Sequence, residues 1–312
     1  MKYLINYKEK PDNTFIFLLD KLPNDIRTGL LDFYIRNRYP AINEIRIKKN
    51  SYIYLIADSK NLKTDIYVNE SDISKIITSI SNGSLYAHID TLKEGYISVG
   101  KGIRAGICGT AVLDNGEISG VKDISSINFR IPQRIAGASN FIYSLLEKTN
   151  FDASLIIYSP PGAGKTTILR DLIEKLSKTN LRFAVIDSRE EIITPYIDSA
   201  NFDTFVSYPK GQAIEIATKS MTPELIICDE ISSESDASAV LKAAHSGVKL
   251  IATTHASSLD ELFSKKILEP LIESNMFDLF IGVKRGYGER KYKFELQSLK
   301  KEALLWKFWA VL

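Results

Sequence analysis

The segment that most constrains the fold runs from an apolar stretch through a glycine-rich turn into a helical pattern. The apolar stretch is 155–158, the turn is Ser159-Pro-Pro-Gly-Ala-Gly, and Lys165-Thr166-Thr167 begin the helical pattern. This order predicts a buried strand, a loop whose backbone N–H groups turn inward, and a helix whose positive dipole end faces the loop. It is typical of the α/β class, in which strands and helices alternate around a parallel sheet.

The same segment predicts a site for a nucleoside triphosphate. Lys165 would hold the β- and γ-phosphates, and Thr166 would ligate Mg²⁺. The expected phosphate contacts are Pro161, Gly162, Ala163, Gly164, Lys165, Thr166 and Thr167. The usual pattern begins with a glycine where this chain has Ser159, so the loop departs from the pattern at its first position. An ordinary Gly/Pro turn is the alternative, but it leaves the acidic residues further along the chain unexplained.

Two adjacent carboxylates end a second apolar run. Residues 225–228, Leu-Ile-Ile-Cys, lead directly into Asp229 and Glu230. The carboxyl ends of parallel strands share one edge of a sheet, which is where such folds bind ligands. We therefore expect Asp229 to lie in the Mg²⁺ shell and Glu230 to polarise the attacking water. The alternative is an acidic helix N-terminus without a catalytic role.

Two further apolar runs bring polar side chains to the same predicted sheet edge. Residues 183–186 precede Asp187-Ser-Arg-Glu190-Glu191, and these acids, Glu190 among them, would orient Mg²⁺ or water. A solvated charge cluster is equally consistent with that segment. Residues 248–252 precede Thr253-Thr254-His255, and His255 at a strand end is expected to sense the state of the nucleotide. A lone histidine is more often structural.

The first part of the chain predicts a smaller α+β domain over residues 1–135. Glycines punctuate short β-like runs from Gly95 to Arg130, and Asp114-Asn-Gly116 is a hairpin turn signal. Proline and glycine in 131–137 mark a connector, so we expect the nucleotide-binding domain over 136–295. An apolar tail follows at 296–312, which would pack on its own core or, alternatively, on a partner or membrane surface.

Composition limits the partners. Forty basic and 38 acidic side chains leave a net charge of +2, too small to indicate a nucleic-acid partner from the overall field. Cys108 and Cys228 lie in apolar stretches, so we expect both to be unpaired small hydrophobes in a reducing cytoplasm. No signal-peptide pattern begins the chain, and no apolar run has the length that crosses a bilayer, so membrane association is expected through partners.

Five segments together resemble a known family. They are the loop at 159–167, Met221–Ile231, Gly247–His255, Gly106–Ala111 and Lys122–Arg130. Over about residues 20 to 290 the chain resembles the stage III sporulation AA proteins, relatives of the type II and type IV secretion ATPases. The resemblance implies a RecA-like P-loop NTPase domain that hydrolyses ATP. It also implies a cytoplasmic mother-cell protein, peripheral to the membrane around the forespore, that works with membrane-embedded channel proteins of the same operon.

By position, the resemblance makes Lys165 and Thr166 the phosphate and Mg²⁺ contacts, and Asp229 and Glu230 the acidic pair. His255 takes the place of the family's histidine-box residue, and residues 187–191 that of its aspartate box. The resemblance further implies a homo-hexameric ring in which an arginine of the amino-terminal domain reaches a neighbour's nucleotide. The candidates for that arginine are Arg104, Arg130 and Arg134, each of which is otherwise a surface residue.

Two other functions remain open at this point. A non-hydrolysing scaffold would use nucleotide as a structural switch, and Ser159 motivates it, although Lys165, Thr166 and Glu230 argue for hydrolysis. A RecA-like nucleic-acid motor would use the same chemistry, but the sequence lacks a concentrated basic or aromatic-interleaved groove.

Overall fold

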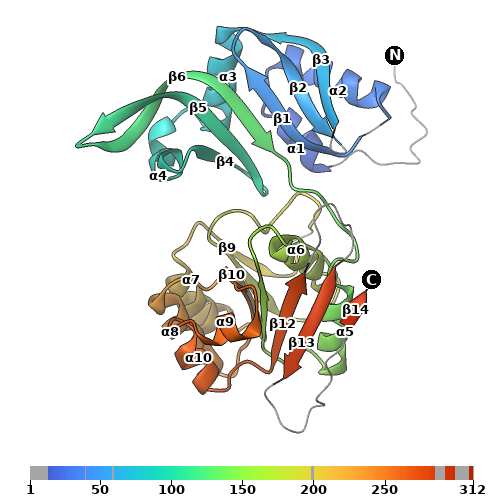
Figure 1. The fold of residues 1–312 in the computed structure, drawn as a ribbon, viewed down its shortest axis with the longest axis vertical. Helices are drawn as coiled ribbons and strands as arrows, with labels where there is room; N and C mark the ends of the chain where they lie inside the picture. Colours follow the sequence, from blue (N-terminus) through green and yellow to red (C-terminus); the bar gives the residue numbers. More distant parts are fainter. Residues whose placement is uncertain are drawn as a thin grey trace. The chain divides into compact units, whose positions relative to one another are not determined.

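A computed structural model describes residues 13–38, 40–57, 60–197, 200–284 and 292–298, together with the backbone of 309–311. The chain forms two compact units, the second of which begins at Arg134 (Figure 1). Each unit has its own sheet.

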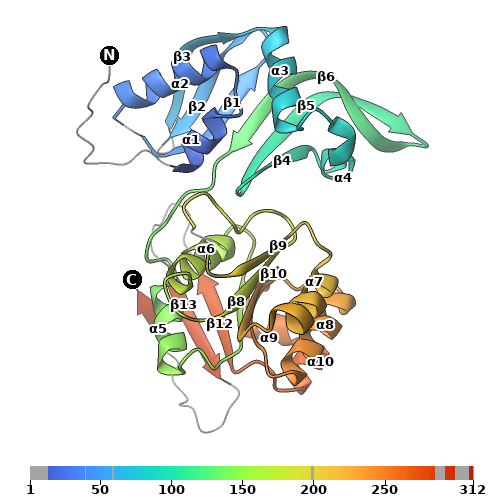
Figure 2. The same ribbon diagram turned by 180° about the vertical axis from the view of Figure 1, so that it is seen from behind.

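The first unit is an antiparallel sheet of six strands with helices on one face (Figure 2). Its strand order is β3-β2-β1-β6-β5-β4. The strands are β1 (Ile42–Lys48), β2 (Ser51–Ala57), β3 (Lys60–Val68), β4 (Tyr96–Gly100), β5 (Ile103–Asp114) and β6 (Glu117–Arg130). The helices are α1 (Asn13–Leu19), α2 (Asn24–Arg36), α3 (Glu70–Ile80), the 3₁₀ helix η1 (Leu85–His88) and α4 (Ile89–Lys93).

Alternation along the strands separates the two faces of this sheet. In β1, Ile45 and Ile47 are buried, whereas Arg46 and Lys48 lie on the opposite face. Helix α3 begins with a capping box at Asn69 and buries an isoleucine stripe in the same core as the β1 isoleucines. The helices therefore cover one face and leave the arginine and lysine of β1 on the other.

The β5–β6 hairpin confirms the turn predicted from Asp-Asn-Gly. Asp114 pairs with Glu117, and both turn residues have positive φ, 49° at Asn115 and 84° at Gly116. Cys108 is unpaired, as expected, but the expectation that it behaves as a small hydrophobe in an apolar setting was wrong, because this residue is exposed. It follows the last buried residue of β5, Ile107, and faces away from the helices, so its apolar sequence neighbours do not enclose it.

The second unit is a mostly parallel sheet of eight strands in the order β14-β13-β12-β7-β11-β10-β8-β9. The strands are β7 (Leu155–Ser159), β8 (Phe183–Asp187), β9 (Asp203–Val206), β10 (Leu225–Glu230), β11 (Lys249–His255), β12 (Leu279–Lys284), β13 (Lys293–Ser298) and β14 (Trp309–Val311). The strands from β12 to β9 in this order run parallel, β13 is antiparallel to β12, and β14 is antiparallel to β13. Part of the predicted apolar tail, residues 299–308 and 312, lies outside the described residues.

Helices cover both faces of this second sheet (Figures 1 and 2). They are α5 (Asn140–Lys148), α6 (Lys165–Leu176), α7 (Lys210–Ile216) with the π-helix η2 (Ala217–Met221), α8 (Glu234–His245), α9 (Leu259–Phe263) and α10 (Glu269–Glu273). Every residue of β7 and β8 is buried, as expected for strands enclosed between two helical layers. Among the described residues, no helix has both the length and the apolar character needed for a membrane crossing.

Candidate nucleotide-binding site

Three neighbouring parallel strands bring the predicted site residues together at their carboxyl ends. The order β7-β11-β10 puts the loop after β7 beside His255 of β11 and the acidic pair of β10. His255 is in register with Ser159, and Glu230 with Thr253. Sheet topology therefore positions residues as far apart in the sequence as Ser159 and His255 at one edge.

The loop has the backbone that a phosphate requires. Gly162 and Gly164 have φ of 75° and 104°, which side chains disfavour. A Cβ at Gly164 would lie 2.8 Å from the Tyr292 ring, so this position has neither the conformation nor the space for one. Helix α6 begins at Lys165, and its first turn contains no acidic side chain. The predicted phosphate-contacting residues 161–167 thus form a turn and a helix N-terminus suited to an anion.

Ser159 occupies the first loop position without strain. It is the last residue of β7, it is buried, and its φ lies outside the positive region. Its hydroxyl donates to the carbonyl of Pro160 at 2.9 Å and accepts a bond from Lys165 at 3.2 Å. A glycine is therefore not needed at this position for conformational reasons, and the serine side chain anchors the site lysine.

His255 links Lys165 to Glu230. Its Nδ1 lies 2.8 Å from Nζ of Lys165, and its Nε2 lies 3.3 Å from Oε2 of Glu230. Because an ammonium group only donates, Nδ1 accepts and Nε2 carries the hydrogen that faces the carboxylate. Lys165 also donates to the Ser159 carbonyl at 3.1 Å. Burial lowers the pKa of Lys165 to about 8, an effect that Glu230 opposes and Lys265 reinforces.

Lys210 is a site residue that the sequence reasoning missed. Its side chain is 8% exposed, and its Nζ lies 2.5 Å from Oδ1 of Asp229 and donates to the Glu230 carbonyl. Burial lowers the pKa of Lys210, but its neighbours Cys228, Asp229 and Asp236 together outweigh burial and raise that pKa. Burial raises the pKa of Asp229, and Lys210 counteracts that effect. One signal was present in the sequence: a lysine after Pro209, at the start of α7, opposes the helix dipole and needs a partner.

The segment after β8 folds around the carboxylate of Asp187. The buried Asp187 carboxylate accepts bonds from the backbone N–H groups of residues 191, 192 and 193 at 2.8–2.9 Å. Glu190, the predicted metal ligand of this segment, accepts a bond from the Ser207 hydroxyl at 2.6 Å. Glu191 is the acid whose charge raises the pKa of Asp229.

The three candidate arginines lie in two different settings. Arg104 on β5 and Arg130 on β6 are direct cross-strand neighbours in the first unit, and Arg104 stacks 4.4 Å over the Tyr96 ring. Arg134 belongs to the second unit, where Nε donates to Glu174 at 3.0 Å and Nη2 donates to the other oxygen of that carboxylate. Its guanidinium is thus bound to helix α6 of its own unit.

The residues present fit a magnesium nucleotide. Within the described part of the chain, no group of three His, Cys, Asp or Glu side chains forms a metal cage. Mg²⁺ does not need such a cage, since it is commonly held by one or two carboxylates with substrate phosphates and water. Thr166 in the first turn of α6 and Asp229 at the end of β10 supply suitable oxygens, and Asp229 already faces a cationic group.

The chain is similar in sequence to known proteins over most of its length. The profile of the family described as sporulation stage III, protein AA matches residues 19–292. Stage III sporulation protein AA of Bacillus subtilis (strain 168) is 30% identical over 282 residues, which cover 87% of this chain and 91% of that protein.

Solved structures share the fold. The ATPase DotB from Legionella pneumophila superposes with a TM-score of 0.62 and 18% identity, over 88% of this chain and 81% of that one. The pilus retraction motor PilT with bound ADP gives a TM-score of 0.62 and 16% identity, over 88% and 83%. These likenesses confirm the predicted fold class, a RecA-like P-loop domain preceded by a smaller α+β domain.

Proposed function

Since the chain belongs to the sporulation stage III, protein AA family, we propose that it is an ATP hydrolase of secretion-ATPase type. It would power a membrane-associated, secretion-like channel complex during sporulation. The observation that best supports hydrolysis is that His255 contacts both Lys165 and Glu230. Glu230 is the acid next to Asp229 in the sequence.

Each contact supports a distinct role. Lys165 and the N–H groups of the loop would bind the phosphates, while Thr166 and Asp229 would hold Mg²⁺. When bound, Mg²⁺ neutralises charge on the β- and γ-phosphate oxygens. Lys165 would exchange its bonds to Ser159 and His255 for bonds to phosphate.

Glu230 is the group best suited to act on the attacking water. Asp229 and Glu230 are adjacent, but Asp229 is held by Lys210 and Glu230 by His255. The imidazole N–H orients the Glu230 carboxylate, whose oxygens would accept a proton from water. Because the two acids have different partners, Asp229 would bind the metal while Glu230 acts as the base.

We extend the proposal to assembly and location. The family resemblance favours ATP over GTP and a homo-hexamer, in the mother-cell cytoplasm, held at the membrane around the forespore by channel proteins of the same operon. Arg104 and Arg130 are the arginines proposed to reach a neighbour's nucleotide, since they are adjacent on one sheet face. Arg134 is the weaker candidate because Glu174 of its own unit binds it.

A non-hydrolysing scaffold is the second candidate. The observation that favours it is that protein groups already satisfy the site, with Lys165 bound by Ser159 and Asp229 by Lys210. Glu230→Gln separates the two functions, with Glu234→Gln, an exposed acid of α8, as the matched control. If the protein is a hydrolase, Glu230→Gln abolishes turnover and preserves ATP affinity, while the control leaves both unchanged. ATP binding without turnover in the unaltered protein would instead support the scaffold.

A further inference from the structure

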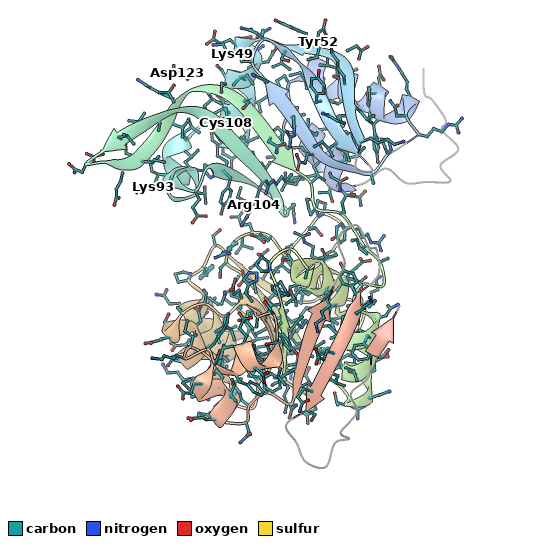
Figure 3. The ribbon with its side chains drawn as sticks, viewed as in Figure 1. Lys49, Tyr52, Lys93, Arg104, Cys108 and Asp123 are labelled. Carbon is teal, nitrogen blue, oxygen red and sulfur yellow. The ribbon has the colours of Figure 1, made fainter. Side chains whose placement is uncertain are left out.

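The uncovered face of the first sheet contains a pocket that the proposed ATPase chemistry does not use. Its volume is about 500 Å³, within the range of ligand sites, and strands β1, β2, β3, β5 and β6 contribute to its lining. Figure 3 marks Tyr52 and Cys108, two of the lining residues, on this sheet.

The charge of the pocket selects an anion. Arg46 and Lys48 line it, and no acidic side chain does. Glu44, next to it on β1, accepts bonds from Nε and Nη2 of Arg46 at 3.1 and 3.0 Å and from Asn128 at 3.2 Å. These bonds hold the Glu44 carboxylate against the sheet and do not involve Nη1 of Arg46. A positively charged surface therefore remains toward solvent.

Aromatic rings lie beside these cations. Tyr52 and Tyr67 are 41% and 54% exposed and meet edge to face at 5.5 Å, and Tyr54 lies in the pocket lining. The Lys63 ammonium lies 4.4 Å from the Tyr52 ring centre. An acidic peptide would be bound by the cations alone, whereas exposed flat rings beside cations suit a ligand with both phosphates and planar bases.

The register arranges these groups in a row across the sheet. Lys63, Tyr54, Arg46, Asn128 and Gly106 are successive cross-strand neighbours from β3 to β5. With strands about 4.8 Å apart, the row extends over about 19 Å. A four-stranded sheet stacks two or three bases in a common RNA-binding module, so this surface is large enough for a short single strand.

We propose that this face binds single-stranded nucleic acid, with phosphates on Arg46 and Lys48 and bases against Tyr52 and its neighbouring tyrosines. The proposal goes beyond ATP hydrolysis and does not depend on it. It also departs from the expectation drawn from the net charge of +2. Net charge is a sum over the whole chain, whereas this pocket gathers cations without acids in its lining.

The test is fluorescence anisotropy of a labelled single-stranded oligouridylate with the full-length protein at low salt and without ATP. Affinity should fall with salt by a log–log slope of about −0.7 for each phosphate contact, and Lys48→Ala should reduce the slope by about one such contact. Lys49→Ala is the matched control, since the Lys49 ammonium pairs with Glu70 of α3. It should change nothing.

The aromatic part of the proposal has its own variant. Tyr52→Leu should weaken binding at least about fivefold without changing the salt slope, because stacking is not an ionic contact. The proposal would be overturned by no binding at low salt, by equal affinity for a duplex, or by equal losses from Lys48→Ala and Lys49→Ala. Displacement of the strand by polyglutamate as effectively as by unlabelled oligonucleotide would overturn it in favour of an acidic protein partner.

Discussion

The Nζ atom of Lys210 lies 2.5 Å from Oδ1 of Asp229, so a protein cation stands beside the carboxylate proposed to hold Mg²⁺. The same ammonium donates to the Glu230 carbonyl. Removing one partner of a buried ion pair leaves an uncompensated charge, which is more costly than the pair itself is stabilising. Lys210 therefore holds the acidic pair in place before a nucleotide binds, and a second cation would have to share or replace its position.

This arrangement predicts that Mg²⁺ stabilises the Lys210→Met variant against unfolding more than it stabilises the unaltered protein. The variant should unfold at lower temperature, because Asp229 loses its partner, and Mg²⁺ without nucleotide should restore more of that loss than it adds to the unaltered protein. Thermal unfolding with and without Mg²⁺ measures both. Lys242→Met is the control, since Lys242 pairs with Glu215 at the surface, where such a pair contributes little. An equal Mg²⁺ response in the two variants would contradict the account.

Nucleotide affinity should depend on pH through Lys165. Its pKa of about 8 in the free protein means that it loses its proton in mildly alkaline solution, whereas phosphate binds the protonated form. ATP should therefore bind about tenfold more weakly at about pH 9 than at about pH 7. Lys165→Arg should show no such slope, because arginine stays charged. Titration with a fluorescent ATP analogue across this range is the measurement, and a flat profile for the unaltered protein would be the contrary result.

The same lowered pKa predicts the direction in which Lys165 makes the free energy of unfolding change with pH. The folded-state pKa of Lys165 lies below the unfolded value of 10.5, so the unfolded chain binds more protons between about pH 8 and 10.5. The contribution of this lysine to the free energy of unfolding should thus rise with pH over that window. Comparing unfolding of the protein and Lys165→Met over the window isolates the effect, and a difference that falls with pH would contradict the assigned shift.

The two loop glycines should differ in their tolerance of a side chain. Gly162→Ala meets only the strain of positive φ, since nothing lies within 4 Å of its added Cβ. Gly164→Ala meets the same strain and the Tyr292 ring at 2.8 Å. Gly164→Ala should therefore lower the free energy of unfolding by roughly 1–3 kcal/mol more than Gly162→Ala. Urea unfolding of both variants tests this, and equal losses would show that Tyr292 yields easily.

Substitutions of the three candidate arginines should differ in their effects, because Arg104 and Arg130 lie in the first unit whereas Arg134 is bound within the second. Arg104→Ala and Arg130→Ala should reduce ATP hydrolysis at high protein concentration and leave ATP affinity at low concentration unchanged, if either side chain completes a neighbour's site. Arg134→Ala serves as the control, because Glu174 of its own unit binds that guanidinium. Loss of ATP affinity in dilute Arg104→Ala or Arg130→Ala would count against a role between subunits.

Much of the site could be predicted because the ends of buried strands can be recognised in the sequence as the ends of apolar runs. Ser159, Glu230 and His255 each lie within three residues of the end of an apolar run, which puts them at strand ends, and parallel strands share an edge. Lys210 was missed because it follows a loop and not an apolar run. Tyr292 was missed because its approach to Gly164 depends on the pairing of β12 with β13, a long-range contact that local patterns do not encode.

The first unit was predictable as α+β but not in its surface chemistry. Alternation indicates that Arg46 and Lys48 share a face, yet which face stays uncovered depends on where the helices pack. The same reason explains Cys108, whose apolar neighbours in sequence belong to the opposite face.

The central claim, ATP hydrolysis at a site that assembly completes, is tested most directly by the rate of ATP hydrolysis over a wide range of protein concentration. The account predicts a rate that rises faster than linearly with concentration and is lost in both Lys165→Ala and Glu230→Gln. A strictly linear rate, or one that survives Glu230→Gln, would contradict it.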